Sequence, residues 1–256
     1  RAFTELLGKT PFAYLRSVRL TEAAKKLRDS GESILDIAFS SAFGSHEGFI
    51  KAFSREYAMS PGEYRKNAPP VRYFSYYPVK SRIKSIEKGG TAMQGTVVFT
   101  QVVERPARKL ILKRGVKAAE YFAYCEEVGC DIWGIRESIK GALGESIGLW
   151  LPEGMRKPGT SEYCQGVEVP ADYSGAIPDG FDIIDLPPCK YMVFHGEPFE
   201  DENFGEAIEV VCDAIKRFNP KHFGWEWAPE DAPRFQLEPI GERGYVEGLP
   251  VREYRR

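Results

Sequence analysis

Residues 33–65 read SILDIAFSSAFGSHEGFIKAFSREYAMSPGEYR, and this stretch predicts the fold of the first quarter of the chain. Ser33 is a typical helix N-cap, and the apolar residues after it share one side of a helix. A short turn at 42–44 leads to a second N-cap, Ser45. From Phe49 onwards, apolar residues recur at the spacing of a helix that packs on one side. The stretch therefore predicts two helices joined by a tight turn.

The polar side of the second predicted helix carries side chains suited to contact DNA. It presents His46, Glu47 and Lys51, which can form hydrogen bonds to base edges or phosphates. In a helix-turn-helix, this face enters the major groove with its N-terminal end first. The alternative interpretation is a solvated face of an ordinary helical bundle.

A repeat extends the pattern towards the N-terminus. Residues 1–14 align with residues 51–64 at a constant offset, and the alanine, phenylalanine, proline and tyrosine of the two segments are identical. A long helix is expected to begin at Thr10-Pro11 and to end at Ser30-Gly31. The upstream counterpart of residues 33–50 would precede Arg1, so the first of the two units is expected to be incomplete.

Residues 1–67 resemble the C-terminal part of the DNA-binding domain of AraC/XylS-type transcription regulators. The resemblance implies two helix-turn-helix units, bridged by one long helix, that each enter a major groove of double-stranded DNA. The matching positions are Pro11, Tyr14, Arg19-Leu20, Ala23, Ile34, Ile37-Ala38, Phe43, Phe49, Phe53, Ser60-Pro61 and Tyr64-Arg65.

The same resemblance assigns the residues that face DNA. They are Arg1, Ser45, His46, Glu47, Gly48 and Lys51. The chain departs from the family at Ala42 and Ala58, two turn positions where glycine is usual. A positive φ at either alanine would cost about 1 kcal/mol, and Gly44 is expected to take over part of the first turn.

The helical region is expected to end before the adjacent prolines at 69–70. Residues 68–95, with an aromatic run followed by basic residues, are predicted to form a linker.

The rest of the chain contains a second repeat. Residues 106–115 align with 187–196, and each segment is a proline-led strand that ends in glycine. A helical stretch is expected after each, at 117–143 and 204–218. Trp150 and Trp227 then correspond, and final strands are expected at 163–169 and 235–238. The fold class is therefore an all-α helix-turn-helix domain followed by an α+β domain of two pseudo-twofold β-α-β-β halves.

Residues 96–256 resemble the GyrI-like effector-binding domain, which implies an aromatic ligand pocket at the junction of the two halves. A carboxylate beside these aromatic rings, from Glu226, Glu238 or Glu247, would attract an organic cation. Gln236 stands where the family usually has glutamate, and strand alternation gives Glu238 the same face. The candidate effector-binding residues are Trp150, Tyr163, Phe194, Trp225, Trp227, Gln236 and Glu238.

Charge and composition agree with this division. Residues 1–95 carry 16 Lys and Arg against 9 Asp and Glu, a net +7, and residues 96–256 carry 19 against 28, a net −9. No apolar run is long enough to span a membrane. No metal site is predicted either, because the three histidines are scattered and the five cysteines show no C-x-x-C spacing. The G-x-S-x-G match at 144–148 is rejected as a nucleophile elbow, since a helix is expected before it and a strand after it.

The sequence therefore favours a cytoplasmic, ligand-responsive transcription regulator with no catalytic residues, cofactor or metal. Its expected partners are double-stranded DNA, a small lipophilic effector that is either cationic or neutral, and RNA polymerase, with no membrane partner. Two alternatives stay open: a GyrI-like hydrolase that acts on reactive small molecules, and a protein-binding module.

Overall fold

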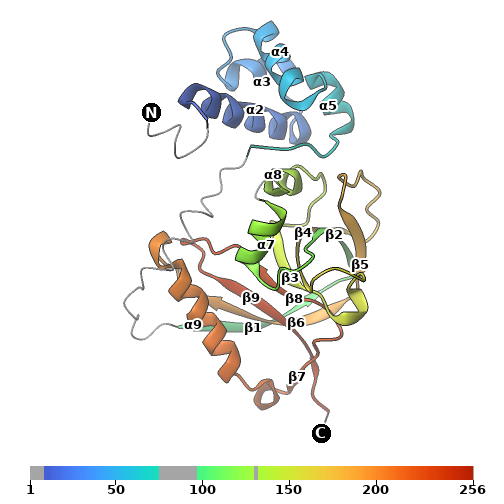
Figure 1. Ribbon diagram of the computed structural model, residues 1–256, viewed down its shortest axis with the longest axis vertical. Helices are drawn as coiled ribbons and strands as arrows, with labels where there is room; N and C mark the ends of the chain where they lie inside the picture. Colours follow the sequence, from blue (N-terminus) through green and yellow to red (C-terminus); the bar gives the residue numbers. More distant parts are fainter. Residues whose placement is uncertain (1–8, 75–96, 130–131, 256) are drawn as a thin grey trace. The chain divides into compact units, whose positions relative to one another are not determined.

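The computed structural model describes residues 9–74, 97–129 and 132–255, which form two compact units. One unit comprises residues 1–76 with 131–140, and the other comprises 77–130 with 141–256 (Figure 1). Arg1 and the linker residues 75–95 lie outside the described residues. No helix in the described part of the chain is both long and apolar enough to cross a bilayer.

Between residues 9 and 74, the first unit contains four helices whose starts are set by capping residues. They are α2 (Pro11–Asp29), α3 (Ile34–Ser40), α4 (His46–Tyr57) and α5 (Pro61–Asn67). The N-caps accept hydrogen bonds from the backbone N–H groups three residues further on, which satisfies a donor that the helix itself leaves open. These caps are Thr10, Ser33, Ser45 and Ser60.

The apolar sides of these helices enclose one core. Leu20, Ala24 and Leu27 of α2 are buried against Ile37 of α3 and Phe53 of α4. The helical spacing predicted from the sequence for α3 and α4 is therefore the spacing of core residues.

Two alanines in this unit hold the left-handed backbone conformation. Ala42 has φ 56°, and Ala58, which follows α4, has φ 57° and ψ 20°. Among the described residues, Gly44 does not have a positive φ. It therefore does not take over the left-handed position of the turn, as was expected. Each alanine therefore carries the steric cost of a Cβ in this region.

We expect Ala58→Gly to stabilise the first unit by about 1 kcal/mol, because glycine adopts this conformation without that cost. The melting temperature should rise by about 4 °C or more. Ala13→Gly, at an exposed position inside α2, is the matched control and should destabilise by about 0.5–1 kcal/mol. A lower melting temperature for Ala58→Gly would contradict the assignment of strain.

The first unit continues beyond α5, so the linker does not begin at residue 68 as expected. Ala68, Val71 and Tyr73 are buried, and the Tyr73 hydroxyl lies 2.8 Å from the hydroxyl of Tyr64. The prolines at 69–70 do end the helix, but the apolar side chains after them keep the chain packed on the helical core. Residues 68–73 are thus part of this unit.

A short helix from much later in the chain, α8 (Ile132–Glu137), completes the first unit. The backbone N–H of Tyr73 donates to Gly134 O at 3.3 Å, and that of Val71 donates to Ser138 Oγ at 2.9 Å. Arg28 donates to Glu137 O at 2.8 Å. The single helical stretch expected at 117–143 is therefore two helices that belong to different units.

The second unit is built on a nine-stranded antiparallel sheet, visible in the lower part of Figure 1. Its strand order is β1-β6-β9-β8-β3-β4-β2-β5, and β7 pairs with β9 off this path. The strands are β1 (Val98–Arg105), β2 (Arg108–Arg114), β3 (Ile147–Trp150), β4 (Tyr163–Pro170), β5 (Asp182–Leu186), β6 (Cys189–Gly196), β7 (Trp225–Trp227), β8 (Arg234–Leu237) and β9 (Val246–Glu253).

The strand order has the two-fold character expected from the repeat, but with different equivalences. The central pair is β3 and β8, so β4 corresponds to β9 and β2 to β6. The expected equivalence of residues 163–169 with 235–238 is therefore wrong, because the fourth strand of the second half is β9. Trp227 lies in β7, which has no counterpart in the first half.

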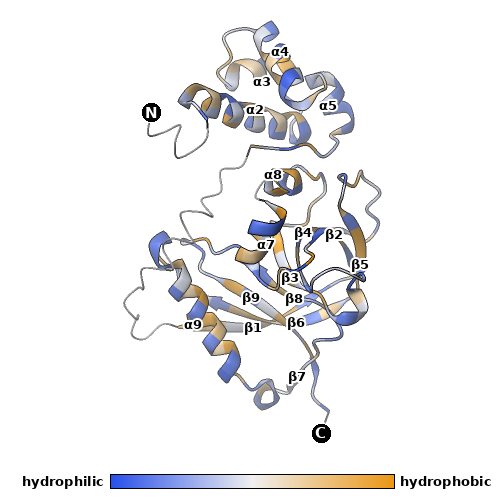
Figure 2. Ribbon diagram, in the orientation of Figure 1, coloured by the Kyte–Doolittle hydropathy of each residue, from blue (hydrophilic) through white to orange (hydrophobic). Residues whose placement is uncertain are grey.

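Helices α7 (Tyr121–Val128) and α9 (Phe204–Arg217) also belong to the second unit. Hydrophobic and hydrophilic residues alternate along α9 (Figure 2), and its Val211 packs in a core with Met192 and Phe194 of β6. Gly129, with φ 86°, ends α7. The two helices contribute side chains to the cavity described below.

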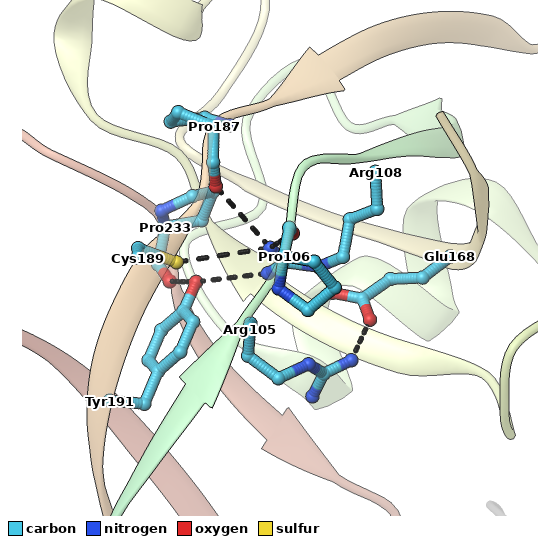
Figure 3. Close-up of polar contacts among 8 residues, drawn as sticks. All are labelled: Arg105, Pro106, Arg108, Glu168, Pro187, Cys189, Tyr191 and Pro233. Carbon is cyan, nitrogen blue, oxygen red and sulfur yellow. Dashed lines mark hydrogen bonds and ion pairs between the residues drawn. The ribbon is translucent and has the colours of Figure 1, made fainter. Parts of the chain in front are cut away.

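A buried ion pair links the β1–β2 connection to the β5–β6 connection (Figure 3). Arg108, 2% exposed, donates to Glu168 Oε1 at 2.8 Å and to Pro187 O at 3.4 Å, and Arg105 also pairs with Glu168. Tyr191 donates to Pro233 O at 2.9 Å. The sheet already pairs β2 with β4 and β5. The contacts that join strands not paired in the sheet are Arg105 with Glu168, between β1 and β4, and Arg108 with the Tyr191 hydroxyl at 3.5 Å, between β2 and β6.

Candidate functional site

The exposed face of α4 carries the polar residues predicted from the sequence. Glu47, Gly48 and Lys51 are exposed and His46 is half-buried, while Phe49 and Phe53 on the other side are buried. The Ser45 hydroxyl accepts a hydrogen bond from the Gly48 N–H at 3.1 Å, so this side chain caps the helix. An acidic, a basic and an imidazole group thus lie on one exposed helical face.

A cavity of about 170 Å³ lies in the second unit, and we call it the Trp150 cavity. Helix α9 contributes Phe204, Ile208 and Cys212, which recur every four residues and therefore share one side of the helix. The start of α7, the end of β3, strands β8 and β9 and the segment between these two strands supply the other walls. These are Glu120, Tyr121, Phe122, Trp150, Arg234, Gln236, Pro239, Tyr245 and Glu247.

A fully buried carboxylate, Glu247, contributes to this cavity. It forms an ion pair with Arg234, and the Tyr245 hydroxyl donates to Glu247 Oε2 at 3.1 Å. Burial raises the pKa of Tyr245, which keeps this hydroxyl protonated as a donor. Gln236 lies opposite Glu247 in the β8–β9 register. Tyr245 also donates to Gln236 Oε1 at 3.2 Å, so Arg234, Gln236, Tyr245 and Glu247 form one connected polar cluster among apolar and aromatic walls.

The Arg234 guanidinium lies over the Trp150 ring, 4.6 Å from the ring centroid to Cζ. Such a distance is typical of a cation–π contact. Arg234 thus joins an aromatic ring and a buried carboxylate within the same cavity.

Comparison with known proteins identifies the helical part of the chain. Residues 1–67 match the family model of a helix-turn-helix domain. The HTH-type transcriptional regulator MtrA of Neisseria gonorrhoeae is 41% identical over 66 residues, which are 26% of this chain and 22% of that protein. The N-terminal part of this chain is a helix-turn-helix domain of the AraC type.

The other comparisons cover parts of the chain in the same way. The HTH-type transcriptional activator RhaS of Klebsiella pneumoniae (strain 342) is 42% identical over 71 residues, which are 28% of this chain and 26% of that protein. The chain spans about a quarter of the length of these curated relatives. A structure of SAV2435 bound to tetraphenylphosphonium matches 60% of this chain and 94% of that chain, with 20% identity and a TM-score of 0.42.

Within the helix-turn-helix domain, α3 and α4 are the two helices joined by the tight turn. The relatives named above are transcription regulators. Five of the six predicted DNA-facing residues lie at the N-cap or in α4, and the sixth, Arg1, lies outside the described residues.

The structure separates the candidate effector-binding residues into groups. Trp150 and Gln236 line the Trp150 cavity. Tyr163 is buried behind them, where its hydroxyl accepts from Gln236 Nε2 at 3.1 Å. Phe194 packs in the core against Phe218, at 5.1 Å between ring centroids.

The remaining three candidates also lie outside the lining of this cavity. Trp225 and Trp227 belong to β7, and Trp227 lines a second, open cavity of about 520 Å³, which it shares with Trp150 and Arg234. Glu238 follows the last residue of β8, so the strand alternation that gave it the face of Gln236 does not extend to it. Instead, Glu247 of β9 is the carboxylate that lies beside Gln236.

Arg234 and Tyr245 line the cavity but were not predicted as site residues, because the strand β9, which brings Glu247 to both of them, was not predicted. The alternation of Tyr245 and Glu247 in the segment 245–253 is the signal that would have placed both residues on one face. No sequence pattern indicates that Arg234 approaches this face, because its contact with Glu247 depends on strand pairing.

Burial raises the pKa of Glu238 to about 7, with Arg243 acting in the opposite direction. The folded protein then binds more protons than the unfolded chain between pH 4.5 and 7, so stability falls as the pH rises through this range. We expect Glu238→Gln to remove this loss and to raise the free energy of unfolding by about 1–3 kcal/mol at pH 8.

Urea unfolding at pH 4 and pH 8 tests this expectation. The gain should vanish at pH 4, and the exposed neighbour Glu242, replaced by Gln, should show no comparable change at either pH. An equal gain for Glu238→Gln at both pH values would exclude ionisation as its cause.

Proposed function

We propose that this chain is a cytoplasmic, DNA-binding transcription regulator whose second unit is a GyrI-like domain that binds a small lipophilic effector. The observation that carries the proposal is the combination, in one chain, of an exposed polar α4 in a helix-turn-helix domain with an aromatic cavity in a separate unit. Double-stranded DNA, the effector and RNA polymerase are the proposed partners.

The DNA-binding part rests on the exposed face of α4. Lys51 supplies a positive charge for a phosphate, while His46 and Glu47, at the N-terminal end, are suited to base edges. Ser45 and Gly48 act by fixing the start of the helix through their hydrogen bond. RNA polymerase enters the proposal because a relative of this domain is a transcriptional activator.

The effector part rests on the walls of the Trp150 cavity. Trp150, Tyr121, Phe122 and Phe204 offer aromatic surface, and the polar cluster around Glu247 lies at one side. Sites of this form suit small molecules with one or two polar groups. A cavity of about 150 Å³ holds benzene in another protein, so the cavity here suits a ligand with a single aromatic ring.

The DNA-binding part is tested by selection from randomised duplexes with the parent protein and two variants. Lys51→Ala should weaken binding to every sequence and reduce the salt slope by about one unit. Glu47→Ala should change the preferred sequence, at about 1–3 kcal/mol for a lost base contact. Lys216→Ala, which removes an exposed lysine of α9, is the control and should leave both properties unchanged.

An unchanged preferred sequence for Glu47→Ala, together with an unchanged affinity for Lys51→Ala, would contradict the proposed DNA-binding face. The effector part is tested by titrating tert-butylbenzene and following Trp fluorescence. Ile208→Trp, which places a bulky side chain in the cavity, should abolish the binding.

A further inference from the structure

We propose that Arg234 determines the charge selectivity of the Trp150 cavity by acting as a resident cation. Its guanidinium occupies the position, between an aromatic face and a buried carboxylate, that a cationic ligand would need. The cavity therefore selects neutral lipophilic ligands over cations of the same shape. This inference rests on the proposed function, because it concerns the ligand of that cavity.

The first support is the pair of contacts that Arg234 makes. Its Cζ lies 4.6 Å from the centroid of the Trp150 ring, and the same guanidinium pairs with Glu247. Tryptophan is the aromatic side chain that binds cations best. The strongest cation-binding face of the cavity is therefore already occupied by a side chain of the protein.

The second support is the burial of the carboxylate. Glu247 has no exposed surface, and its second oxygen accepts from Tyr245 and lies 3.8 Å from the Cys212 thiol. A ligand cation would have to separate Glu247 from Arg234 and leave the guanidinium without this partner. The Arg234 side chain is 38% exposed, but Glu247 is fully buried, so removing its partner leaves a buried carboxylate uncompensated, whereas a neutral ring leaves the pair intact.

The third support concerns the other acidic residue of the lining, Glu120. Its carboxylate accepts from the backbone N–H groups of Phe122 and Ala123, at 2.8 and 2.7 Å, and so caps α7. Both carboxylates that line the cavity are thus engaged with groups of the protein. No carboxylate of the described lining is left over to compensate the charge of a ligand.

The test compares two ligands of equal shape, phenyltrimethylammonium and its neutral isostere tert-butylbenzene, by titration of the full chain. The parent should bind the neutral ligand tighter than the cation by about tenfold or more, because only the cation must disrupt the ion pair. A large excess of the cation should not displace the neutral ligand from the parent.

Arg234→Met should then raise the affinity for phenyltrimethylammonium by about 30-fold, because the Trp150 face and Glu247 become accessible. The affinity for tert-butylbenzene should change by less than about threefold. The additional change Glu247→Gln should reverse this gain. Arg156→Met removes a half-exposed arginine of the neighbouring open cavity, paired with Glu162 at 2.8 Å, and should alter neither affinity. Arg234→Lys retains the charge and should retain the preference for the neutral ligand.

Equal affinity of the parent for both ligands would overturn the inference without any variant. An equal gain in affinity for the two ligands in Arg234→Met would also overturn it, because it would indicate only that the cavity had become larger. Loss of the neutral preference in Arg234→Lys would also overturn it. If neither ligand binds the parent or any variant, the proposed effector site itself is contradicted instead. If Arg234→Met unfolds, the parent titration and Arg234→Lys still decide the question.

Discussion

Replacement of Arg108 by methionine is expected to lower the free energy of unfolding by about 3–5 kcal/mol. The substitution removes the buried partner of Glu168 and leaves the carbonyl oxygens of Pro106 and Pro187 without this donor. Methionine has a similar length, so lost packing contributes little. Urea unfolding of the full chain, followed by the fluorescence of the tryptophans in the second unit, measures the change.

A surface ion pair provides the matched control for this substitution. Arg252 pairs with Glu226 at 2.7 Å, but the two side chains are 58% and 30% exposed. Arg252→Met should therefore cost far less than Arg108→Met. Similar losses for the two methionine variants would show that the Arg108 cluster does not hold the ends of the sheet together.

Gly134→Ala is the second change for which we expect a large effect on stability. Unusually for a glycine-to-alanine change inside a helix, it should destabilise the protein. Alanine inside a helix normally stabilises by about 1 kcal/mol relative to glycine. At Gly134, however, a Cβ would lie 1.8 Å from the carbonyl oxygen of Tyr73. The helix α8 must therefore move away from the segment 71–73, and we expect a loss of about 3 kcal/mol.

Gly62→Ala is the control, because Gly62 is also a helical glycine of the first unit and its Cβ would meet only Ile34 Cδ1 at 3.9 Å. This variant should stabilise by about 0.5–1 kcal/mol. Amide hydrogen exchange adds a local measurement, since the N–H groups of Val71 and Tyr73 should exchange faster only in Gly134→Ala. Unchanged protection of these two amides would contradict the packing of α8 in the first unit.

The sequence was most informative where structure depends on local pattern. The N-caps Ser33 and Ser45 and the spacing of Phe49, Phe53 and Tyr57 predict the helix-turn-helix, because capping and helical periodicity involve residues close in the chain. The strands β2 and β6 were found for a similar reason, as short apolar runs bounded by proline and glycine.

Pairings between distant strands could not be obtained in this way. Glu247 approaches Arg234 and Gln236 only because β9 lies beside β8 in the sheet, and the sequence gives no direct measure of which strands become neighbours. The strand alternation used for Glu238 does not reach this residue, because β8 ends at Leu237, one residue before it. The membership of α8 in the first unit was missed for the same reason, since its partners Val71 and Tyr73 lie about 60 positions earlier.

The path of the chain through α8 limits how this protein can be divided. The backbone passes between the two units at three places, after residues 76, 130 and 140. A single proteolytic cut between residues 77 and 130 would therefore not release the helical unit, because residues 131–140 remain part of it and stay covalently joined to the sheet. A chimera that fuses residues 1–67 to a foreign sensor would likewise lack Val71, Tyr73 and α8, the last pieces of the helical unit.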